Sequence, residues 1–237
     1  MANRSSFDDR DPEYSDTVTT GLIDLTDDCL FRPLADSSAW SLLSGARIQW
    51  IGPDCQRKVL YHDTHAENQV SVVVDICSGA ERVYPHSITP TTRDGRRGFS
   101  VDYRRVKRGQ PAYGYPSGNI DPIAKEPDID GIRLVDLTRG TCRLIVSMAE
   151  LAQWNRHPSM ESALHWIAPI HLSRGDSRIA FLHRRRKTAT KRWIKRIFDR
   201  FFSPFIPRPV RRWVKEYFSG WNTRLSQSIT MGPGCEA

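Results

Sequence analysis

The chain has 237 residues, of which 39% are hydrophobic, so it is long enough for one domain with a sizeable core or for a domain with an appendage. The formal net charge is +8, but residues 184–216 carry 13 Lys and Arg against two acids, which leaves the remainder slightly acidic. The first residues are polar and no apolar run reaches the roughly 18 residues of a spanning helix, so we expect neither a secretory signal nor a transmembrane segment.

The first 44 residues give few structural signals. Residues 1–20 are polar, and we expect them to be disordered. Residues 21–25 can form a strand and residues 40–43 a short helical turn. From Gly45 onward, short β-branched runs are bounded by Gly and Asp turns, a pattern typical of β-hairpins. We expect strands within residues 46–51, 59–63, 69–76, 82–85, 96–103, 131–137, 142–148 and 177–183.

Two kinds of turn unit recur between these runs. VVDICSGAERVYP (73–85) and LVDLTRGTCRLIV (134–146) share the same spacing of Asp, Gly and Arg. A Gly/Asp turn before a basic residue and a strand occurs at 53–63, 92–103 and 173–183. The two kinds alternate along the chain, which predicts repeated antiparallel blades, because one hairpin cannot bury its own apolar face. We therefore expect a mainly β fold, an incomplete β-propeller-like arc, with a generic antiparallel sandwich as the alternative.

The stretch from residue 44 to residue 184 resembles the bacterial TolB-like, WD40-like β-propeller proteins related to oligogalacturonate lyase. GARIQW, PAYGYP and the HW…FLHR stretch carry this resemblance. It implies about three blades within residues 21–184, a basic insertion at 185–220, and the start of a further, truncated blade at 221–237. Many members of that group are uncharacterised and resemble proteins encoded beside glycan-biosynthesis enzymes.

The chain departs from the pattern of this group in its turns and in one dipeptide. Thr92-Arg93-Asp94-Gly95 and Ser173-Arg174-Gly175-Asp176 stand where the group has Ser-Pro-Asp-Gly, although Asp and Gly can still form the turn. Ala168-Pro169 stands where the group commonly has Asn-His, and in the lyases a His in this neighbourhood binds the metal. The later His-rich motif of the lyases lies beyond the end of this chain, so a complete lyase site is not expected.

Histidines supply the candidate metal ligands. His165, His171 and His183 are the predicted set, with Mn²⁺ as cofactor only if the chain acts as a lyase; otherwise no cofactor is expected. Their spacings match no tight metal signature, and His165 and His183 equally fit hydrogen-bonded core or strand-end residues. His62 and His65 flank Asp63 in an expected turn, which favours the surface. No nucleophile elbow or phosphate-binding loop occurs, so the catalytic residues are unknown.

A second candidate site is the basic, tyrosine-containing stretch after residue 103. Cations next to aromatic rings suit sugar stacking and contacts with carboxylates. We expect binding of an acidic glycan by Arg105, Arg108, Tyr113 and Tyr115. The alternative is a long loop whose tyrosines pack against their own blade.

The basic segment reads as two short amphipathic helices, at 191–202 and 210–221, separated by prolines. Aromatic faces flanked by Arg and Lys fit contact with an anionic membrane surface. The predicted membrane contacts are Arg192, Trp193, Lys195, Arg196, Phe198, Phe201, Arg212 and Trp213. The alternative is packing onto the blades, or onto a protein partner that covers an open blade edge, and nucleic acid fits these apolar faces less well.

These observations predict a non-catalytic binding or scaffold module associated with glycan or polysaccharide metabolism. Five widely spaced cysteines favour reduced thiols, so we expect a cytoplasmic protein, peripheral to the inner face of the membrane. Two alternatives stay open. One is a metal-dependent uronate lyase, a carbon–oxygen lyase acting on polysaccharides, or its inactive relic. The other is a truncated gene fragment.

Overall fold

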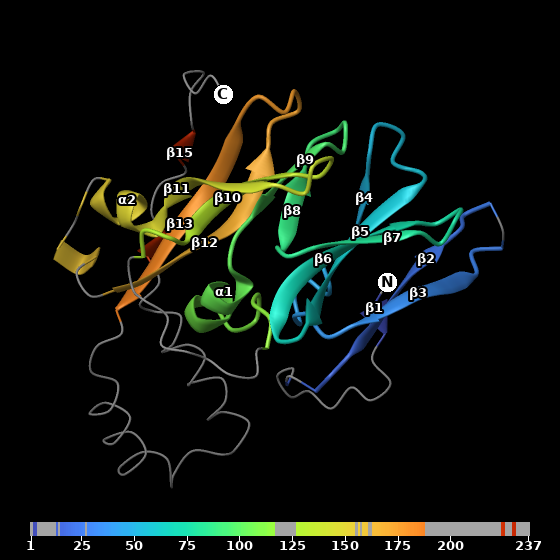
Figure 1. Cartoon of the computed structure of the whole chain (residues 1–237). Coiled ribbons are helices and arrows are strands. Elements are labelled where there is room, and N and C mark those ends of the chain that lie inside the picture. Colours follow the sequence, from blue (N-terminus) through green and yellow to red (C-terminus); the bar gives the residue numbers. More distant parts are fainter. Residues whose placement is uncertain are drawn as a thin grey trace, which may run out of the picture.

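The computed structural model describes residues 2–3, 13, 15–26, 28–116, 127–154, 156, 158–160, 163–187, 224–225 and 229–230. Within these residues the chain is mainly β, with four antiparallel sheets and two α-helices, so the coarse fold class is confirmed. The sheets follow one another across the molecule in chain order (Figure 1). The predicted helices at 191–202 and 210–221 lie outside the described residues, as do all eight predicted membrane contacts.

The first sheet begins inside the region that was expected to be disordered. Its strands are β1 (Ala2–Asn3), β2 (Val18–Ile23) and β3 (Phe31–Ser37). Val18 is buried, and β1 and β3 both pair with β2. The expectation of disorder is therefore wrong for residues 18–20, where an alternation of buried and half-buried positions supplies an apolar face.

The next two sheets are meanders of four consecutive strands each. The second sheet comprises β4 (Gln49–Ile51), β5 (Lys58–His65), β6 (Asn68–Asp75) and β7 (Glu81–Tyr84). The third sheet comprises β8 (Ile88–Thr91), β9 (Arg97–Ser100), β10 (Gly131–Asp136) and β11 (Cys142–Ser147). Most of the predicted strands are found, whereas β3, β8 and, in the fourth sheet, β12 (Ala163–Leu172) were not expected. Each of these three contains a proline.

The fourth sheet contains the longest strands, β12 (Ala163–Leu172) and β13 (Ile179–Lys187). The short strands β14 (Arg224–Leu225) and β15 (Ile229–Thr230) both pair with β13. The register of β12 and β13 shifts between Ile167 and Ile170, around Pro169, which has no N–H to donate to the ladder.

The repeated turn units have equivalent structures. In the second sheet, the Asp75 carboxylate accepts hydrogen bonds from the N–H groups of Cys77 and Ser78 in the turn to β7. In the third sheet, Asp136 accepts from Thr138 and Arg139 in the turn to β11. The shared Asp and Gly spacing therefore marks the second hairpin of each meander, because the carboxylate caps the turn from inside.

Meander topology divides each sheet into two ends. In four consecutive antiparallel strands, the first and last turns lie at one end and the middle connection lies at the other. We call the end with the first and last turns the hairpin end. Three of its turns, β4–β5, β8–β9 and β12–β13, lie toward the top of Figure 1. The middle connection is the two-residue turn Ala66-Glu67 in the second sheet, but it spans residues 101–130 in the third.

The middle connection of the third sheet contains a helix that the sequence pattern did not predict. Helix α1 (Tyr103–Gly109) starts at Asp102, whose carboxylate accepts from the N–H of Arg104. Helix α2 (Met148–Gln153) follows β11 directly and has a capping box of Ser147 and Glu150. A single 3₁₀ turn, η1 (Pro158–Met160), precedes β12. The strand expected at residues 96–103 thus ends early, at Ser100.

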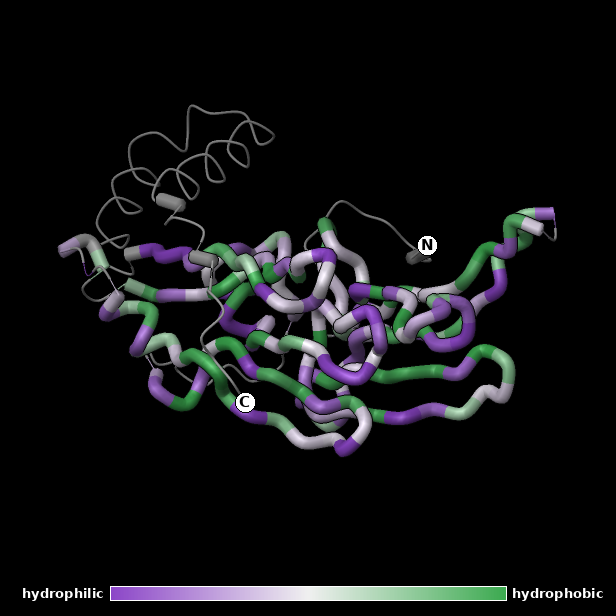
Figure 2. Tube along the Cα trace, turned by 90° about the horizontal axis from the view of Figure 1, so that it is seen from above, coloured by the Kyte–Doolittle hydropathy of each residue, from purple (hydrophilic) through white to green (hydrophobic). Residues whose placement is uncertain are grey.

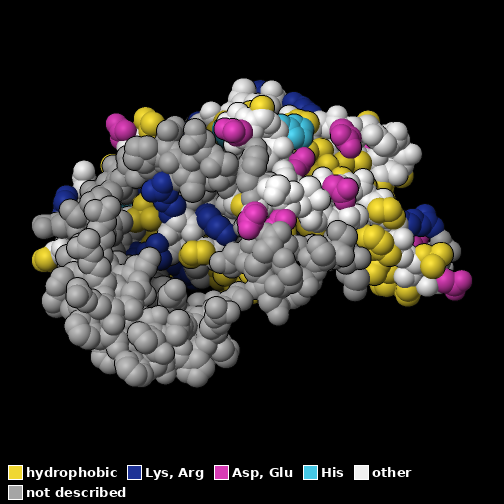
Figure 3. Space-filling model, turned by 90° about the horizontal axis from the view of Figure 1, so that it is seen from below, with side chains coloured by type: hydrophobic (Ala, Val, Ile, Leu, Met, Phe, Trp, Pro, Cys, Tyr) yellow, Lys and Arg dark blue, Asp and Glu magenta, His cyan; other side chains and the backbone are white. Residues whose placement is uncertain are grey.

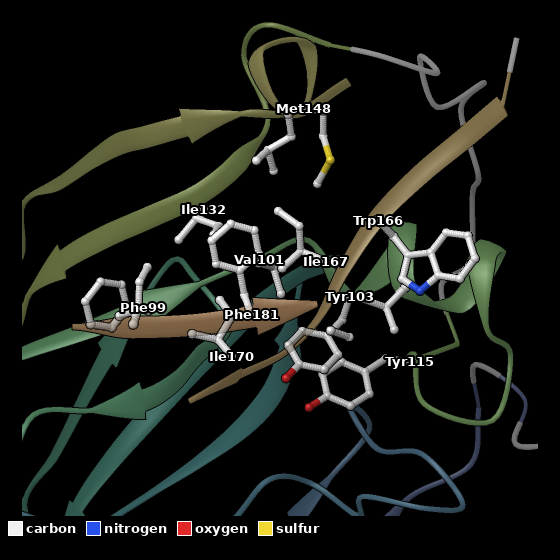
Figure 4. Close-up of a cluster of buried hydrophobic side chains, with 14 of the residues drawn as sticks. Phe99, Val101, Tyr103, Tyr115, Ile132, Met148, Trp166, Ile167, Ile170 and Phe181 are labelled. Carbon is white, nitrogen blue, oxygen red and sulfur yellow. The ribbon is translucent and has the colours of Figure 1, made fainter. Parts of the chain in front are cut away.

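The largest buried cluster joins the third and fourth sheets to both helices. Phe99 and Ile132 come from the third sheet, and Trp166 and Phe181 from the fourth (Figure 4). Along the chain trace, hydrophobic stretches alternate with hydrophilic ones (Figure 2). Among the described residues, no helix is long and apolar enough to cross a membrane.

Candidate ligand-binding pocket

A pocket of about 700 Å³ opens at the hairpin end of the second and third sheets. Its walls are the turns that follow β4, β6, β8 and β10. These turns are far apart in the sequence, and the meander topology brings them together because each turn joins strands at the same end. The volume lies within the range of small-molecule sites in proteins.

One face of the second sheet builds most of the pocket. Side chains alternate between the two faces of a strand, and the register aligns Ile51, Lys58 and Asp75 on the same face. Val73 pairs with Arg82 on that face too. Ile51 lies level with Lys58, and Val73 lies level with Arg82. The apolar members are buried and form the floor, while the exposed charged members, Lys58 and Arg82, lie at the rim.

The floor is buried and hydrogen-bonded to the neighbouring sheet. Ile51, Val73, Tyr84 and Leu137 line it, and each is at most 8% exposed. The Tyr84 hydroxyl donates to the carbonyl of Leu137 at 2.5 Å, which satisfies the phenol and joins the two sheets beneath the pocket. Burial raises the pKa of Tyr84 above its usual value, so this hydroxyl stays protonated at neutral pH.

The rim carboxylates stabilise the turns to which they belong. Asp75 accepts two backbone N–H groups and also the Arg57 Nε–H, at 2.6 Å. Asp94 accepts from the Thr92 hydroxyl at 2.7 Å and from the N–H of Arg96. Hydrogen bonds from Thr92 and Arg96 lower the pKa of Asp94, and those from Ser78, Arg57 and Cys77 lower that of Asp75 despite its opposing desolvation. Both groups are thus ionised near neutral pH with much of their accepting capacity in use.

Three cations complete the rim: Arg57, Lys58 and Arg82. The Arg57 side chain is 59% exposed although it pairs with Asp75. The Arg82 guanidinium lies over the Tyr84 ring at 4.9 Å and donates to the carbonyl of Thr138 at 3.1 Å. These contacts use one nitrogen of Arg82 and hold its plane at the mouth of the pocket.

The turns around the pocket hold one another in place. A Cβ atom at Gly95 would lie 2.7 Å from the backbone nitrogen of Gly52, so the β8–β9 turn fits against the β4–β5 turn only with glycine there. The carboxylate of Asp176, in the β12–β13 turn, accepts from the N–H of Arg93 at 2.6 Å. The hairpin ends of three sheets are therefore in direct contact.

The basic, tyrosine-containing stretch predicted to bind a glycan is mostly interior. Tyr115 is fully buried and stacks on Tyr103 with ring centroids 4.5 Å apart (Figure 4). Arg105 is 3% exposed and donates to Asp130 at 2.6 Å and to the carbonyl of His165 at 3.2 Å. Tyr113 is half-buried against the main core, and Arg108 is half-buried as well. Tyr115 packs on Tyr103 of its own connection but also on His62 of the second sheet, so the alternative interpretation, packing against the same blade, is met only in part.

His62 was expected at the surface, and that expectation is wrong. The side chain is fully buried beside the two stacked tyrosines. Its Nε2–H donates to the carbonyl of Ile88 at 2.9 Å, so Nδ1 accepts from the hydroxyl of Tyr115. Burial, together with nearby Arg47 and against the hydrogen bond to Ile88, lowers the pKa of His62 to about 3. His62 lies in strand β5 rather than in a turn, and its side chain faces the connection between β9 and β10.

The structure brings His165 and His183 together but separates His171 from them. His165 Nδ1 and His183 Nε2 are 2.8 Å apart in the interior between β12 and β13. His165 Nε2 lies 3.3 Å from the carbonyl of Met160, while His171 is exposed. Burial, then the neighbouring His165, lowers the pKa of His183 to about 4. In the described part of the chain, no three His, Cys, Asp or Glu side chains gather as a metal site would require.

Two arginines of β13 contact the C-terminal end of α1, at the end of the molecule opposite the pocket. Arg184 donates to the side chain of Gln110, and Arg186 donates to the carbonyl of Arg108. The view from below shows Lys and Arg side chains gathered on one part of that face (Figure 3). These contacts attach β13 to the C-terminal end of α1.

The pocket was not predicted from the sequence, although the sequence contains a signal for it. The repeated turn units contain the Asp and Gly residues that surround the pocket. The alternation of side chains along a strand places Lys58 and Arg82 on the same face of the second sheet. The sequence pattern does not show that the second sheet packs beside the third, because local patterns do not encode contacts between sheets. Comparison with known proteins adds no assignment, because no family model and no curated protein matches the chain.

Proposed function

We propose that this chain is a non-catalytic binding module, a β-propeller-like arc that takes a polar saccharide-sized ligand in the pocket between its second and third sheets. The observation that carries the proposal is the combination of a buried apolar floor with a charged rim. Sugar rings present C–H faces and polar edges, and such ligands suit this combination.

The blade-like arrangement supports the architectural part. The second and third sheets are meanders with equivalent turns, and the fourth sheet repeats their first hairpin. All three sheets are in contact at the hairpin end. Repeats of one supersecondary unit that share contacts at one end are typical of propeller blades. The resemblance to TolB-like proteins points the same way and suggests a role beside glycan metabolism.

We further propose that the basic segment contacts an anionic membrane surface, and the topology of the fourth sheet supports this. Residues 188–223 connect β13 to β14, the position that the connection 101–130 occupies in the third sheet. Strand β13, which leads into this connection, ends at Lys187, at the end opposite the pocket. A peripheral protein could thus contact anionic lipid through this end and keep the pocket open.

A titration with oligosaccharides tests the binding proposal. Isothermal titration calorimetry of the full chain with trigalacturonate and with a neutral galactotriose should show saturable binding of at least one. Arg143→Gln should retain binding, because this side chain is exposed and lies outside the pocket, whereas Val73→Arg should abolish it by filling the floor. Thermal melts of both variants check folding. Failure of every saccharide to bind the folded chain would exclude this function.

A further inference from the structure

The turns at the hairpin end of the third and fourth sheets are strongly basic. We call residues 92–97, 138–141 and 173–178 the arginine turns, and they follow β8, β10 and β12. Together they contain six arginines and two acids. The corresponding turns of the second sheet, 52–58 and 75–82, hold three cations and three acids. The excess of positive charge at this end therefore belongs to the third and fourth sheets.

Hydrogen bonds join the arginine turns into one surface. The N–H of Arg93 donates to the Asp176 carboxylate at 2.6 Å, which holds the β8–β9 turn against the β12–β13 turn. The N–H of Leu137 donates to the carbonyl of Arg96 at 2.8 Å, which sets the β10–β11 turn beside the β8–β9 turn. Their arginines therefore lie at one end of the molecule although they are far apart in the sequence.

The side chains of these arginines keep their donors. All six are exposed: Arg93, Arg96, Arg97, Arg139, Arg174 and Arg178. Across the described part of the chain, their hydrogen bonds run through backbone groups, and none of the six guanidinium groups is in an ion pair. The two acids instead accept hydrogen bonds within and between the turns. Each guanidinium thus offers a planar fork of five N–H donors, which fits paired phosphate oxygens.

The composition of the arginine turns favours one class of polyanion. Apart from arginine they contain only Asp, Gly, Ser and Thr. Protein interfaces depend on aromatic or aliphatic anchors, and peripheral membrane binding depends on apolar side chains that enter the lipid. The phosphate backbone of nucleic acid, in contrast, can be bound by charge alone. Because single-stranded nucleic acid is usually held by stacking on aromatic rings, these turns suit a duplex better than a single strand.

We propose that the arginine turns bind the phosphate backbone of a nucleic-acid duplex, independently of its base sequence. The arginines neutralise phosphates through charge-assisted hydrogen bonds, and such contacts hold a duplex without reading its bases. DNA and RNA duplexes share this backbone chemistry. None of the six arginines lines the pocket between the second and third sheets, so this binding goes beyond the proposed function and does not depend on it.

Fluorescence anisotropy of the full chain with short DNA and RNA duplexes of one sequence tests the proposal. Affinity should fall steeply between 50 and 200 mM salt. Combining Arg93→Gln, Arg139→Gln and Arg174→Gln should lower the slope of log K against log salt by about 2–3, because each phosphate contact contributes about 0.9. Arginine-dependent binding of either duplex supports the proposal, and the tighter of the two identifies the nucleic acid.

Arg156→Gln is the matched control for Arg174→Gln, because it removes an exposed arginine between α2 and η1, outside the arginine turns. Arg174→Gln should lower the salt slope by about 1, whereas Arg156→Gln should leave it unchanged. The basic segment at 184–216 also attracts polyanions, but it is the same in every variant, so the differences in slope report the turns alone. Melting temperatures of the variants should match the parent, since these side chains are exposed.

Three results would overturn the proposal. One is the absence of duplex binding at 50 mM salt, and another is an equal slope for the triple variant and Arg156→Gln. The third is a triple variant that loses binding to anionic vesicles but keeps the duplex, which would assign the turns to a lipid surface. Titration of the triple variant with trigalacturonate should match the parent, so failure of duplex binding leaves the function of the pocket untouched.

Discussion

At the scale of single residues, buried histidines are the most consequential feature. His62 and His165 lie in different parts of the interior, and each uses one ring nitrogen to donate to a backbone carbonyl. The other nitrogen then accepts from Tyr115 or from His183. Each imidazole is therefore held neutral in one tautomer, and protonation would require an interior charge.

The phenol of Tyr115 should contribute to stability through His62. Tyr115→Phe leaves His62 Nδ1 buried without a donor, and we expect a loss of about 1–3 kcal/mol in the free energy of unfolding. Urea denaturation measures it. Tyr113→Phe is the matched control, because Tyr113 is half-buried in the same stretch, and it should change stability by less than about 0.5 kcal/mol. Equal effects of the two variants would contradict the hydrogen-bond argument.

Stability should also fall in mildly acidic solution. The pKa of His62 is lowered to about 3 and that of His183 to about 4, chiefly by burial, so the unfolded chain binds these protons first. Between pH 6.5 and 4.5 each histidine should remove up to about 1.4 kcal/mol per pH unit from the free energy of unfolding. Urea titrations at pH 7.5, 6.0 and 5.0 measure the slope. His62→Gln should reduce it, and an unchanged slope would rule His62 out as its source.

At the scale of elements, packing of α1 on β12 depends on a residue without a side chain. A Cβ atom at Gly109 would lie 2.2–2.6 Å from ring carbons of Trp166, which is fully buried. Gly109→Ala should therefore destabilise the fold by about 1–3 kcal/mol, although alanine favours helix. Gly175→Ala is the control, because nothing lies within 4 Å of the added atom. A melting temperature that rises in Gly109→Ala would refute this close contact.

Elements differ in how far the sequence predicted them. Strands β5, β6, β10 and β11 follow from β-branched runs between Asp/Gly turns, because period and turn chemistry are local properties. Helix α1 was missed because its seven residues are too few for a periodic signal, and Gly109 ends it against a distant tryptophan. The burial of His62 and Arg105 was missed for a related reason. Their partners are 25–60 residues away in the chain.

At the scale of the whole molecule, charge is distributed unevenly. The 13 basic residues within 184–216 outweigh two acids, while the rest of the chain has 22 basic and 25 acidic residues. A concentrated positive segment attracts anionic lipid, and each cation near the surface contributes about 1 kcal/mol. Salt screens this attraction.

Sedimentation with vesicles tests this asymmetry. The chain should co-sediment with phosphatidylserine-containing vesicles at 50 mM salt, much less at 500 mM, and not with neutral vesicles. Removal of residues 187–218 should abolish co-sedimentation while trigalacturonate binding persists. Binding to neutral vesicles that is indifferent to salt would show that charge is not the cause. Retention of an RNA oligonucleotide in place of vesicles would point instead to a nucleic-acid partner.

The two-residue turn Ala66-Glu67 marks a place where the molecule can accept foreign sequence. The equivalent position of the third sheet already carries thirty residues, 101–130, between two paired strands. Both Ala66 and Glu67 are exposed, and their turn lies at the far end of β5 from Lys58. A fluorescent reporter inserted there would be held by the second sheet away from the pocket, so the labelled chain should still bind its ligand.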